Sequence, residues 1–208
     1  MFAENELKNK ELLFVTKQGT VRRTAYKEFE TKKDSIFAYK LKEGDEVLNV
    51  EKYEPNKTLL FVTDTGTTLN ADISDVELQT RGSSGVKGIK LDDDANLICA
   101  TLVGEADKVV IATDACFAKT VAVSEIGVLP RNRKGLKIIS LSDNGKKLLY
   151  AHKLLSNIFE IFALDAKDKP YYISTDNISL ESRTSKGKSF AGKKGTKVKA
   201  IYTYLWRE

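Results

Sequence analysis

The sequence predicts an all-β fold of the propeller type, with about four blades of four short strands each. Two observations support this prediction: strand-forming segments recur along the chain, and turn residues divide each recurrence into short pieces. A period of roughly 40–50 residues is typical of propellers and similar radial arrays. No stretch shows the apolar periodicity of an amphipathic helix, so helices are not expected in the core.

Two columns of residues define the repeat. The first column ends an apolar strand segment (LLFVT, LLFVT, VVIAT and IFALD) and contains Thr16, Thr63, Thr113 and Asp165. The second column contains the apolar residues Phe29, Val76, Ile126 and Ile178. Both columns step by 47, 50 and 52 residues, and independent columns rarely share such irregular steps by chance. We therefore expect one domain over residues 1–208, with repeats at about 12–58, 59–108, 109–157 and 158–208.

Each repeat is expected to open with a β-hairpin. In the first repeat, strands at 12–16 and 20–24 flank the turn at 17–19, where Gly19 can adopt a positive φ. In the second repeat, strands at 59–63 and 67–70 flank the turn at 64–66. A short connector then leads to the apolar residue of the second column, which we expect to anchor the connector to its blade.

Two further strands are expected to complete each repeat. The third strand is expected at 36–41, 86–91, 136–141 and 188–192, and the fourth at 46–50, 96–100, 147–151 and 197–202. Four short strands separated by turn signals are the pattern of a propeller blade. Alternation in the last strand predicts that Val198, Ala200 and Tyr202 share one face.

Charged residues gather at two places in each repeat. The net charge of +5, with a pI near 9.0, is a mild excess. The turn before the fourth strand is acidic and contains Glu43, Asp45, Glu46, Asp92, Asp93, Asp94 and Asp143. The loop before the third strand is basic and contains Lys32, Lys33, Arg81, Arg131, Arg133, Lys134, Arg183, Lys186 and Lys188. We expect one acidic and one basic rim, the basic one forming a curved track of cations for a polyanion.

The composition argues against several classes of protein. No apolar run approaches the roughly 20 residues that a membrane helix needs, and the first ten residues lack the apolar centre of a signal peptide. Cys99 and Cys116 are too few for a disulfide scaffold. Two reduced thiols fit a cytoplasmic protein. We therefore expect no contact with a membrane.

The sequence contains no recognisable catalytic constellation. The single histidine, His152, cannot supply a metal site or a Ser-His-Asp triad. The run Asp92–Asp94 could hold Mg²⁺, but the other repeats place ordinary turns there. Gly82, Gly85 and Gly88 resemble a phosphate-binding loop, yet no helix follows them. We expect neither a metal nor a cofactor, and a tight loop at these glycines.

Two long segments resemble one family. The string VTKQGTVRRTAYKEF followed by AYKLKEGDEVLNV, and the string TRGSSGVKGIKLDDDANLICA, resemble the C-terminal domain of the A subunits of bacterial type II topoisomerases. That family includes DNA gyrase and topoisomerase IV. The second string resembles the family's R-x-x-x-G-V-K-G-I-K-L segment. The resemblance covers the chain from about Leu12, is strong in the first two repeats and weakens towards the fourth.

The resemblance implies a β-pinwheel, a propeller-like ring whose four-stranded blades exchange strands with their neighbours. It also implies that double-stranded DNA wraps on the basic outer edge of the disc. On this basis, the family's basic positions fall on Arg22, Arg23, Arg81, Lys87, Lys90, Arg131 and Lys137. Arg183, Lys186 and Lys188 match by their place in a diverged blade.

The chain departs from the family in two ways. Gyrase A subunits carry a Gln-Arg-Arg-Gly-Gly-Arg-Gly box in the first blade, whereas the corresponding loop here reads ETKKDSI. This favours a protein like topoisomerase IV, or a fragment that begins after the blade with the box. Gyrase-type domains also commonly have more blades, and the strand-passage core with its tyrosine nucleophile is absent from this sequence.

The predicted function is non-catalytic binding and bending of duplex DNA through phosphate contacts. The expected partners are double-stranded DNA, the rest of the A subunit of the topoisomerase, and the B subunit of the holoenzyme, at the nucleoid in the cytoplasm. The alternative is a propeller scaffold that binds other proteins, which predicts an exposed apolar patch. A propeller hydrolase would need convergent carboxylates around the channel, whereas the acids here lie mainly in turns.

Overall fold

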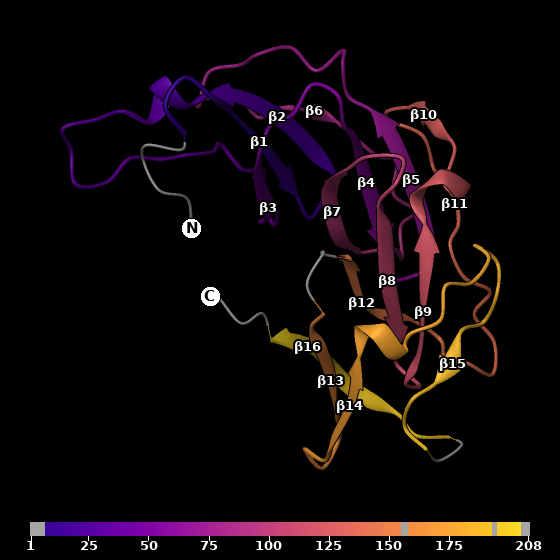
Figure 1. Ribbon diagram of the computed structural model, residues 1–208. Helices are drawn as coiled ribbons and strands as arrows, with labels where there is room; N and C mark the ends of the chain where they lie inside the picture. Colours follow the sequence, from indigo (N-terminus) through magenta and orange to yellow (C-terminus); the bar gives the residue numbers. More distant parts are fainter. Residues whose placement is uncertain (1–6, 155–157, 193–194, 205–208) are drawn as a thin grey trace.

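The strands form four sheets that follow one another around an arc (Figure 1). The computed structural model describes residues 7–154, 158–192 and 195–204. The prediction of an all-β, propeller-like fold is confirmed by these sheets. Residues 155–157 and 205–208, which end the third and fourth predicted repeats, lie outside the described residues.

Each sheet is built on one of the predicted hairpins. The first contains β1 (Glu11–Thr16), β2 (Thr20–Ala25), β3 (Val47–Lys52) and β6 (Val86–Lys87). The second contains β4 (Thr58–Thr63), β5 (Thr67–Asp72), β7 (Leu97–Val103), β10 (Val128–Pro130) and β11 (Leu136–Lys137). The third contains β8 (Lys108–Thr113), β9 (Phe117–Ala122), β12 (Leu148–Lys153) and β15 (Lys188–Ser189). The fourth contains β13 (Glu160–Asp165), β14 (Pro170–Ser174) and β16 (Val198–Tyr204).

Short 3₁₀ helices replace the predicted connectors after three hairpins. They are η1 (Tyr26–Phe29), η2 (Val123–Glu125) and η3 (Thr175–Asn177). The anchors Val76, Ile126 and Ile178 are buried, at 1%, 2% and 7% exposure. Phe29 is half-buried and packs against Phe14, with their ring centroids 5.7 Å apart. The anchoring role predicted for the second column is therefore observed.

In the second, third and fourth repeats, the third strand crosses to the sheet of the preceding repeat. β6 pairs with β2, β11 with β5 and β15 with β9, all antiparallel. The fourth strand then returns to its own hairpin, as β7 does when it pairs with β4. Successive sheets are thus joined by main-chain hydrogen bonds as well as by packing, which is the strand exchange that the resemblance implies.

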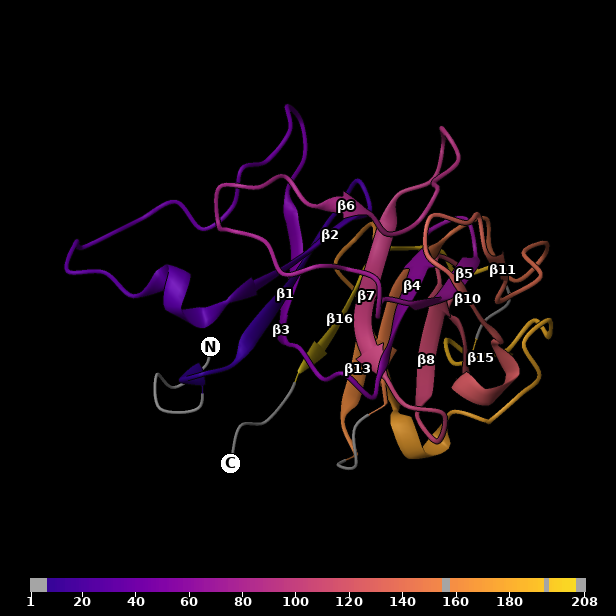
Figure 2. The ribbon, with the colours of Figure 1, turned by 90° about the horizontal axis from the view of Figure 1, so that it is seen from above.

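The third strand predicted for the first repeat is absent. Residues 36–41 have no strand assignment, and the segment between η1 and β3 projects from the first sheet (Figures 1 and 2). The prediction rests on apolar composition. The third strands β6, β11 and β15 each form against the hairpin of a preceding sheet, and the described residues contain no such hairpin ahead of β1. As a result, the Phe37 side chain is 88% exposed.

In the fourth sheet, a proline lies on β14 at the position where the second strand of each other hairpin pairs with an incoming third strand. In the other sheets, Val21, Thr68 and Ala118 lie in the register that pairs with the incoming third strand. Pro170 occupies the same register in the fourth hairpin, because it pairs with Leu164 as Ala118 pairs with Ala112. Proline has no N–H to donate, so this edge is poorly suited to accept another strand.

Apolar clusters fill the spaces between successive sheets. One cluster joins the first sheet to the second around Phe61, another joins the second to the third around Ile111, and another joins the third to the fourth around Ile161. The inner strands β3, β7 and β12 lie next to one another and border a cavity of about 480 Å³. The arc therefore has an inner side made of fourth strands and an outer side made of third strands (Figure 1).

The face assignment predicted for the last strand is wrong. Val198 and Ile201 both pack into the third apolar cluster, whereas Tyr202 is 49% exposed. A register shift lies between Leu164 and Asp165 opposite β16. This β-bulge adds a residue to one strand, and side chains beyond it change face.

Candidate nucleic-acid interface

The basic loops lie along the outer side of the arc, because each leads into a third strand at the outer edge of a sheet. We call the loops 81–85, 131–135 and 183–187, together with β6, β11 and β15, the basic arc. Figure 1 shows β6, β11 and β15 in succession along that side. The arrangement brings cations from three successive repeats onto one outer surface.

A glycine ends each of these loops. Gly85, Gly135 and Gly187 have φ of 79°, 85° and 75°, a region that residues with side chains seldom adopt. A Cβ at Gly135 would lie 2.2 Å from the carbonyl oxygen of Thr68. The glycines therefore permit the sharp turn and the close approach of the loop to the second strand. The prediction of a tight loop at Gly85 is confirmed.

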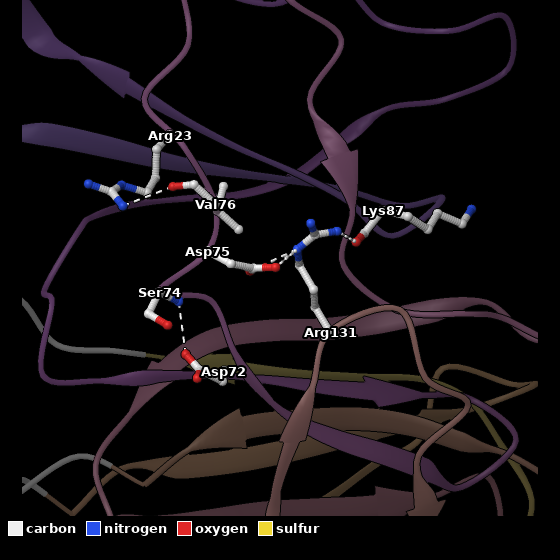
Figure 3. Close-up of polar contacts among 7 residues, drawn as sticks. All are labelled: Arg23, Asp72, Ser74, Asp75, Val76, Lys87 and Arg131. Carbon is white, nitrogen blue, oxygen red and sulfur yellow. Dashed lines mark hydrogen bonds and ion pairs between the residues drawn. The ribbon is translucent and has the colours of Figure 1, made fainter.

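The first arginine of each basic loop binds the preceding repeat. Arg131 donates from Nη1 to the carbonyl oxygen of Lys87 at 3.0 Å (Figure 3). Arg81 makes the equivalent bond to the carbonyl oxygen of Phe37 at 2.9 Å. Arg183 does the same with the carbonyl oxygen of Lys137. Each of these arginines links its own repeat to the preceding one. Some of its N–H donors are therefore used within the protein.

Arg131 makes a second contact within the protein. Its Nε lies 2.9 Å from Oδ1 of Asp75 and 3.0 Å from Oδ2, so the guanidinium is held between this carboxylate and the Lys87 carbonyl. Only 25% of the Arg131 side chain is exposed. In Figure 3 the Lys87 side chain extends away from this contact. The arginine thus orders the backbone from which an exposed lysine projects.

The predicted separation of acidic and basic rims is wrong. Lys134 forms an ion pair with Asp92 at 2.5 Å, and Lys186 forms one with Asp143 at 2.7 Å. Each pair joins the basic loop of one repeat to the acidic turn of the repeat before it. Strand exchange causes this meeting, because it carries each basic loop over the preceding repeat. The Lys186 pair lowers the pKa of Asp143 to about 2.

Two predicted interface residues lie inside the protein. Arg22 has no exposed surface, and its guanidinium binds main-chain carbonyl oxygens. Arg23 is 16% exposed, forms an ion pair with Glu11 at 2.7 Å and lies 3.9 Å from the ring centroid of Tyr53. Adjacent residues on a strand face opposite sides, and both sides of β2 are covered. These residues are therefore removed from the candidate interface.

The remaining predicted cations are exposed. Among the described residues, the side chains of Lys90, Arg133 and Lys137 make no hydrogen bond or ion pair. Lys87 reaches the carbonyl oxygen of Gln18 at 3.2 Å, and Lys188 reaches Oγ of Ser179 at 2.9 Å. Lys32 and Lys33 are exposed in the projecting segment of the first repeat, which is not one of the three loops of the basic arc. The cations free to meet an external anion are thus mainly on the third strands and in the loop of the third repeat.

Sequence reasoning missed one buried cation. Lys119 has no exposed surface and lies at the position in its hairpin that Arg22 has in the first. Its Nζ binds carbonyl oxygens of the loop that contains Arg183. The signal was available, because Lys119 lies six residues after the column threonine Thr113, just as Arg22 lies six residues after Thr16.

The described part of the chain shows no cluster of metal-binding side chains. Within it, no group of three or more His, Cys, Asp or Glu side chains could hold a metal ion. His152 is half-buried and its Nδ1 lies 2.6 Å from the carbonyl oxygen of Lys153. Cys99 and Cys116 are free, and burial raises the pKa of each thiol. None of the described helices is long and apolar enough to span a membrane.

Comparison with known proteins identifies relatives of most of the chain. The family model described as "DNA gyrase C-terminal domain, beta-propeller" matches residues 10–53, 57–99 and 107–146. The A subunit of DNA gyrase from Mycolicibacterium smegmatis is 24% identical over 179 residues, which are 85% of this chain and 21% of the relative. The A subunit of DNA topoisomerase 4 from Staphylococcus aureus is 24% identical over 143 residues, 67% of this chain and 18% of the relative. The chain therefore spans about a fifth of the length of these relatives.

Solved structures share the fold. The C-terminal domain of DNA topoisomerase IV has a TM-score of 0.81 and 24% identity, over 94% of this chain and 62% of that one. The DNA gyrase A C-terminal domain has a TM-score of 0.73 and 21% identity, over 95% and 66%. The E. coli ParC C-terminal domain has a TM-score of 0.67 and 17% identity, over 94% and 79%.

Proposed function

The chain belongs to the DNA gyrase C-terminal domain, beta-propeller family, and from this membership we propose that it binds and bends duplex DNA along its basic arc. In this proposal the domain makes and breaks no covalent bond. It holds a DNA segment and presents it to the strand-passage core of a type II topoisomerase. The parent protein would be ATP-dependent and would include a B subunit.

The observation that carries the proposal is the exposed cations on successive third strands. Lys87 on β6, Lys137 on β11 and Lys188 on β15 come from three successive sheets on the outer side of the arc. Lys90 and Arg133 add exposed charge that has no partner among the residues the structure describes. A duplex carries one negative charge per about 1.7 Å of its axis, so a curved row of cations can neutralise phosphates in succession.

The proposed binding is tolerant of sequence. Lysine and arginine contacts to phosphates position a duplex and carry no base information directly. Any preference would come from how easily a sequence bends around the arc, since bending a short site costs about 1–6 kcal/mol. Several phosphate contacts can offset a cost of that size.

A gel-shift titration of a random-sequence duplex tests the proposal. If six to ten phosphates are engaged, affinity should fall roughly 10³–10⁵-fold between 50 and 200 mM salt. An unrelated duplex of equal length should bind with similar affinity. Absence of a shift at low salt would rule out the proposed function. A topology assay on relaxed plasmid with a nicking-closing enzyme would then reveal whether the bound DNA is wrapped with a defined handedness.

One observation favours the alternative of a protein-binding scaffold. Leu78, Val128 and Leu180 recur at equivalent places and are 50%, 55% and 55% exposed. Such a column could contact another protein. Retention on a heparin column with loss at moderate salt supports the DNA proposal, whereas flow-through at low salt favours the scaffold.

A further inference from the structure

Two cations inside the protein lie beneath two of the basic loops. Arg22 on β2 and Lys119 on β9 both have 0% exposure. They occupy the same hairpin register, because Arg22 pairs with Phe14 and Lys119 with Ile111, two residues before the column threonine in each repeat. A buried cation is costly unless it is paired or hydrogen-bonded, so the groups that satisfy these two cations indicate their role.

Lys119 is satisfied almost entirely by one loop. Its Nζ donates to the carbonyl oxygens of Ser182, Arg183 and Ser185 at 2.8, 2.9 and 2.9 Å. A longer contact of 3.3 Å reaches Oγ of Ser185. An ammonium group has three N–H donors, so three carbonyl oxygens match it. These oxygens converge only when the loop curves around the ammonium.

Arg22 does the same for the loop of the second repeat. Its Nη1 donates to the carbonyl oxygens of Arg81 and Ser83 at 2.6 and 3.0 Å. Its Nη2 donates to the carbonyl oxygen of Ala38 at 2.6 Å, which ties the projecting segment of the first repeat to the same point. The ring of Tyr39 covers the guanidinium, with its centroid 4.1 Å from Cζ.

The second hairpin provides an internal comparison. Its residue in this register is Leu69, which pairs with Phe61 and is 1% exposed within an apolar cluster. The loop above it, 131–135, has no cation beneath it and keeps only the outer contact that all three loops share, in which Arg131 binds the Lys87 carbonyl, together with the ion pair to Asp75. The fold therefore accepts a leucine here, and a cation is needed only where it has loop carbonyls to bind.

We propose that Arg22 and Lys119 are positioning residues, each of which binds the carbonyl oxygens of one basic loop from inside and thereby fixes where that loop presents its surface cations. For Lys119 the presented cations are Lys186 and Lys188, and for Arg22 the presented cation is Lys87. The link to duplex binding rests on the proposed function, whereas the ordering of the loops does not.

Amide hydrogen exchange of the full chain at neutral pH tests the ordering. Lys119→Leu copies the residue of the second hairpin and removes the charge and all the donors. We expect exchange in residues 182–187 to become about tenfold faster or more, because hydrogen bonds to a charged group are lost. Exchange in residues 131–135 should stay at the wild-type rate.

Two further variants separate positioning from general packing. Lys119→Arg should restore slow exchange in 182–187, because the guanidinium of Arg22 performs this role in the same register. Leu69→Met is the matched control and should change neither loop. The duplex affinity at low salt should fall for Lys119→Leu, recover for Lys119→Arg and stay unchanged for Leu69→Met.

Each outcome is decisive. A folded Lys119→Leu variant with wild-type exchange in 182–187 would overturn the proposal. Should that variant not fold, the ¹⁵N–¹H signal of the wild-type Lys119 ammonium decides, since an ammonium held by three carbonyls exchanges slowly with water and a mobile one does not. If the wild type fails to bind a duplex at low salt, the proposed function fails, while the exchange data still decide whether the cations position the loops.

Discussion

Arg131 donates a hydrogen bond to the carbonyl oxygen of Lys87, the residue of the preceding repeat that itself carries an exposed cation. The same relationship links Arg81 to Phe37 and Arg183 to Lys137. In each case an arginine that looks like a surface cation in the sequence is a connection between repeats. Experiments on the basic arc must take this into account, because replacing one of these arginines removes a contact between repeats as well as a positive charge.

The Arg131 contact should contribute to stability. We expect Arg131→Gln to lower the unfolding free energy by about 1–2 kcal/mol, because the Lys87 carbonyl loses a charged donor. The ion pair with Asp75 should add little, since that carboxylate is largely exposed. Urea unfolding measures the change. Arg133→Gln removes a neighbouring exposed arginine and should stay within about 0.5 kcal/mol of wild type. Equal losses in both variants would contradict the connecting role.

The exposed lysine of β11 should act on DNA rather than on stability. We expect Lys137→Gln to weaken duplex binding for all sequences and to reduce the slope of log affinity against log salt by about 1. Fluorescence anisotropy at several salt concentrations provides the slope. Lys52→Gln carries the same charge change on the inner strand β3 and serves as the control. A slope that changes equally in both variants would mean that only net charge matters.

The ion pair between Lys186 and Asp143 should restrain DNA binding. Asp143→Asn frees the lysine for a phosphate, so we expect affinity at low salt to rise roughly threefold and the gain to vanish at high salt. The unfolding free energy should change little, because both partners are exposed. Glu105→Gln makes the same change in net charge in the turn between β7 and β8. If it raises affinity as much, the local pair is not the cause.

Lys119 predicts a specific pH dependence of stability. Burial lowers its pKa from 10.5 to about 8, and nearby Glu181, Glu125 and Arg183 modulate that effect. Between these values the unfolded chain binds the proton and the folded chain releases it. The unfolding free energy contributed by this group therefore rises as pH increases through the window. Urea unfolding of wild type and Lys119→Arg on either side of pH 8 measures it. Parallel pH profiles would refute the assignment, because arginine does not titrate there.

Much of the fold was predictable because the determinants are local. The predicted positions of β1, β2, β4 and β5 are correct to within a few residues at each end. Their turn residues and their pattern of apolar residues lie within short segments of the chain. The missing third strand at 36–41 shows the limit. Its composition resembles that of β6, but a strand also needs a partner, and partners come from elsewhere in the chain.

For the candidate site, the sequence predicted the basic loops but not which of the cations are exposed. The sequence placed basic loops in each repeat, and the structure gathers three of them along the outer side. The sequence alone did not distinguish Arg22 and Arg131 from Lys90 and Lys137. The first two are bound within the protein and the others are unpaired among the described residues.

The sequence by itself determined the repeat, the hairpins and the identity of the basic loops, because each of these depends on residues close together in the chain. Only the tertiary structure decided which cations face outward. Strand exchange carries each loop onto its neighbour, where carbonyl oxygens and carboxylates of another repeat capture some cations and leave others exposed. That choice depends on contacts between residues some forty or more positions apart, such as Arg131 and Lys87, and no local pattern specifies them.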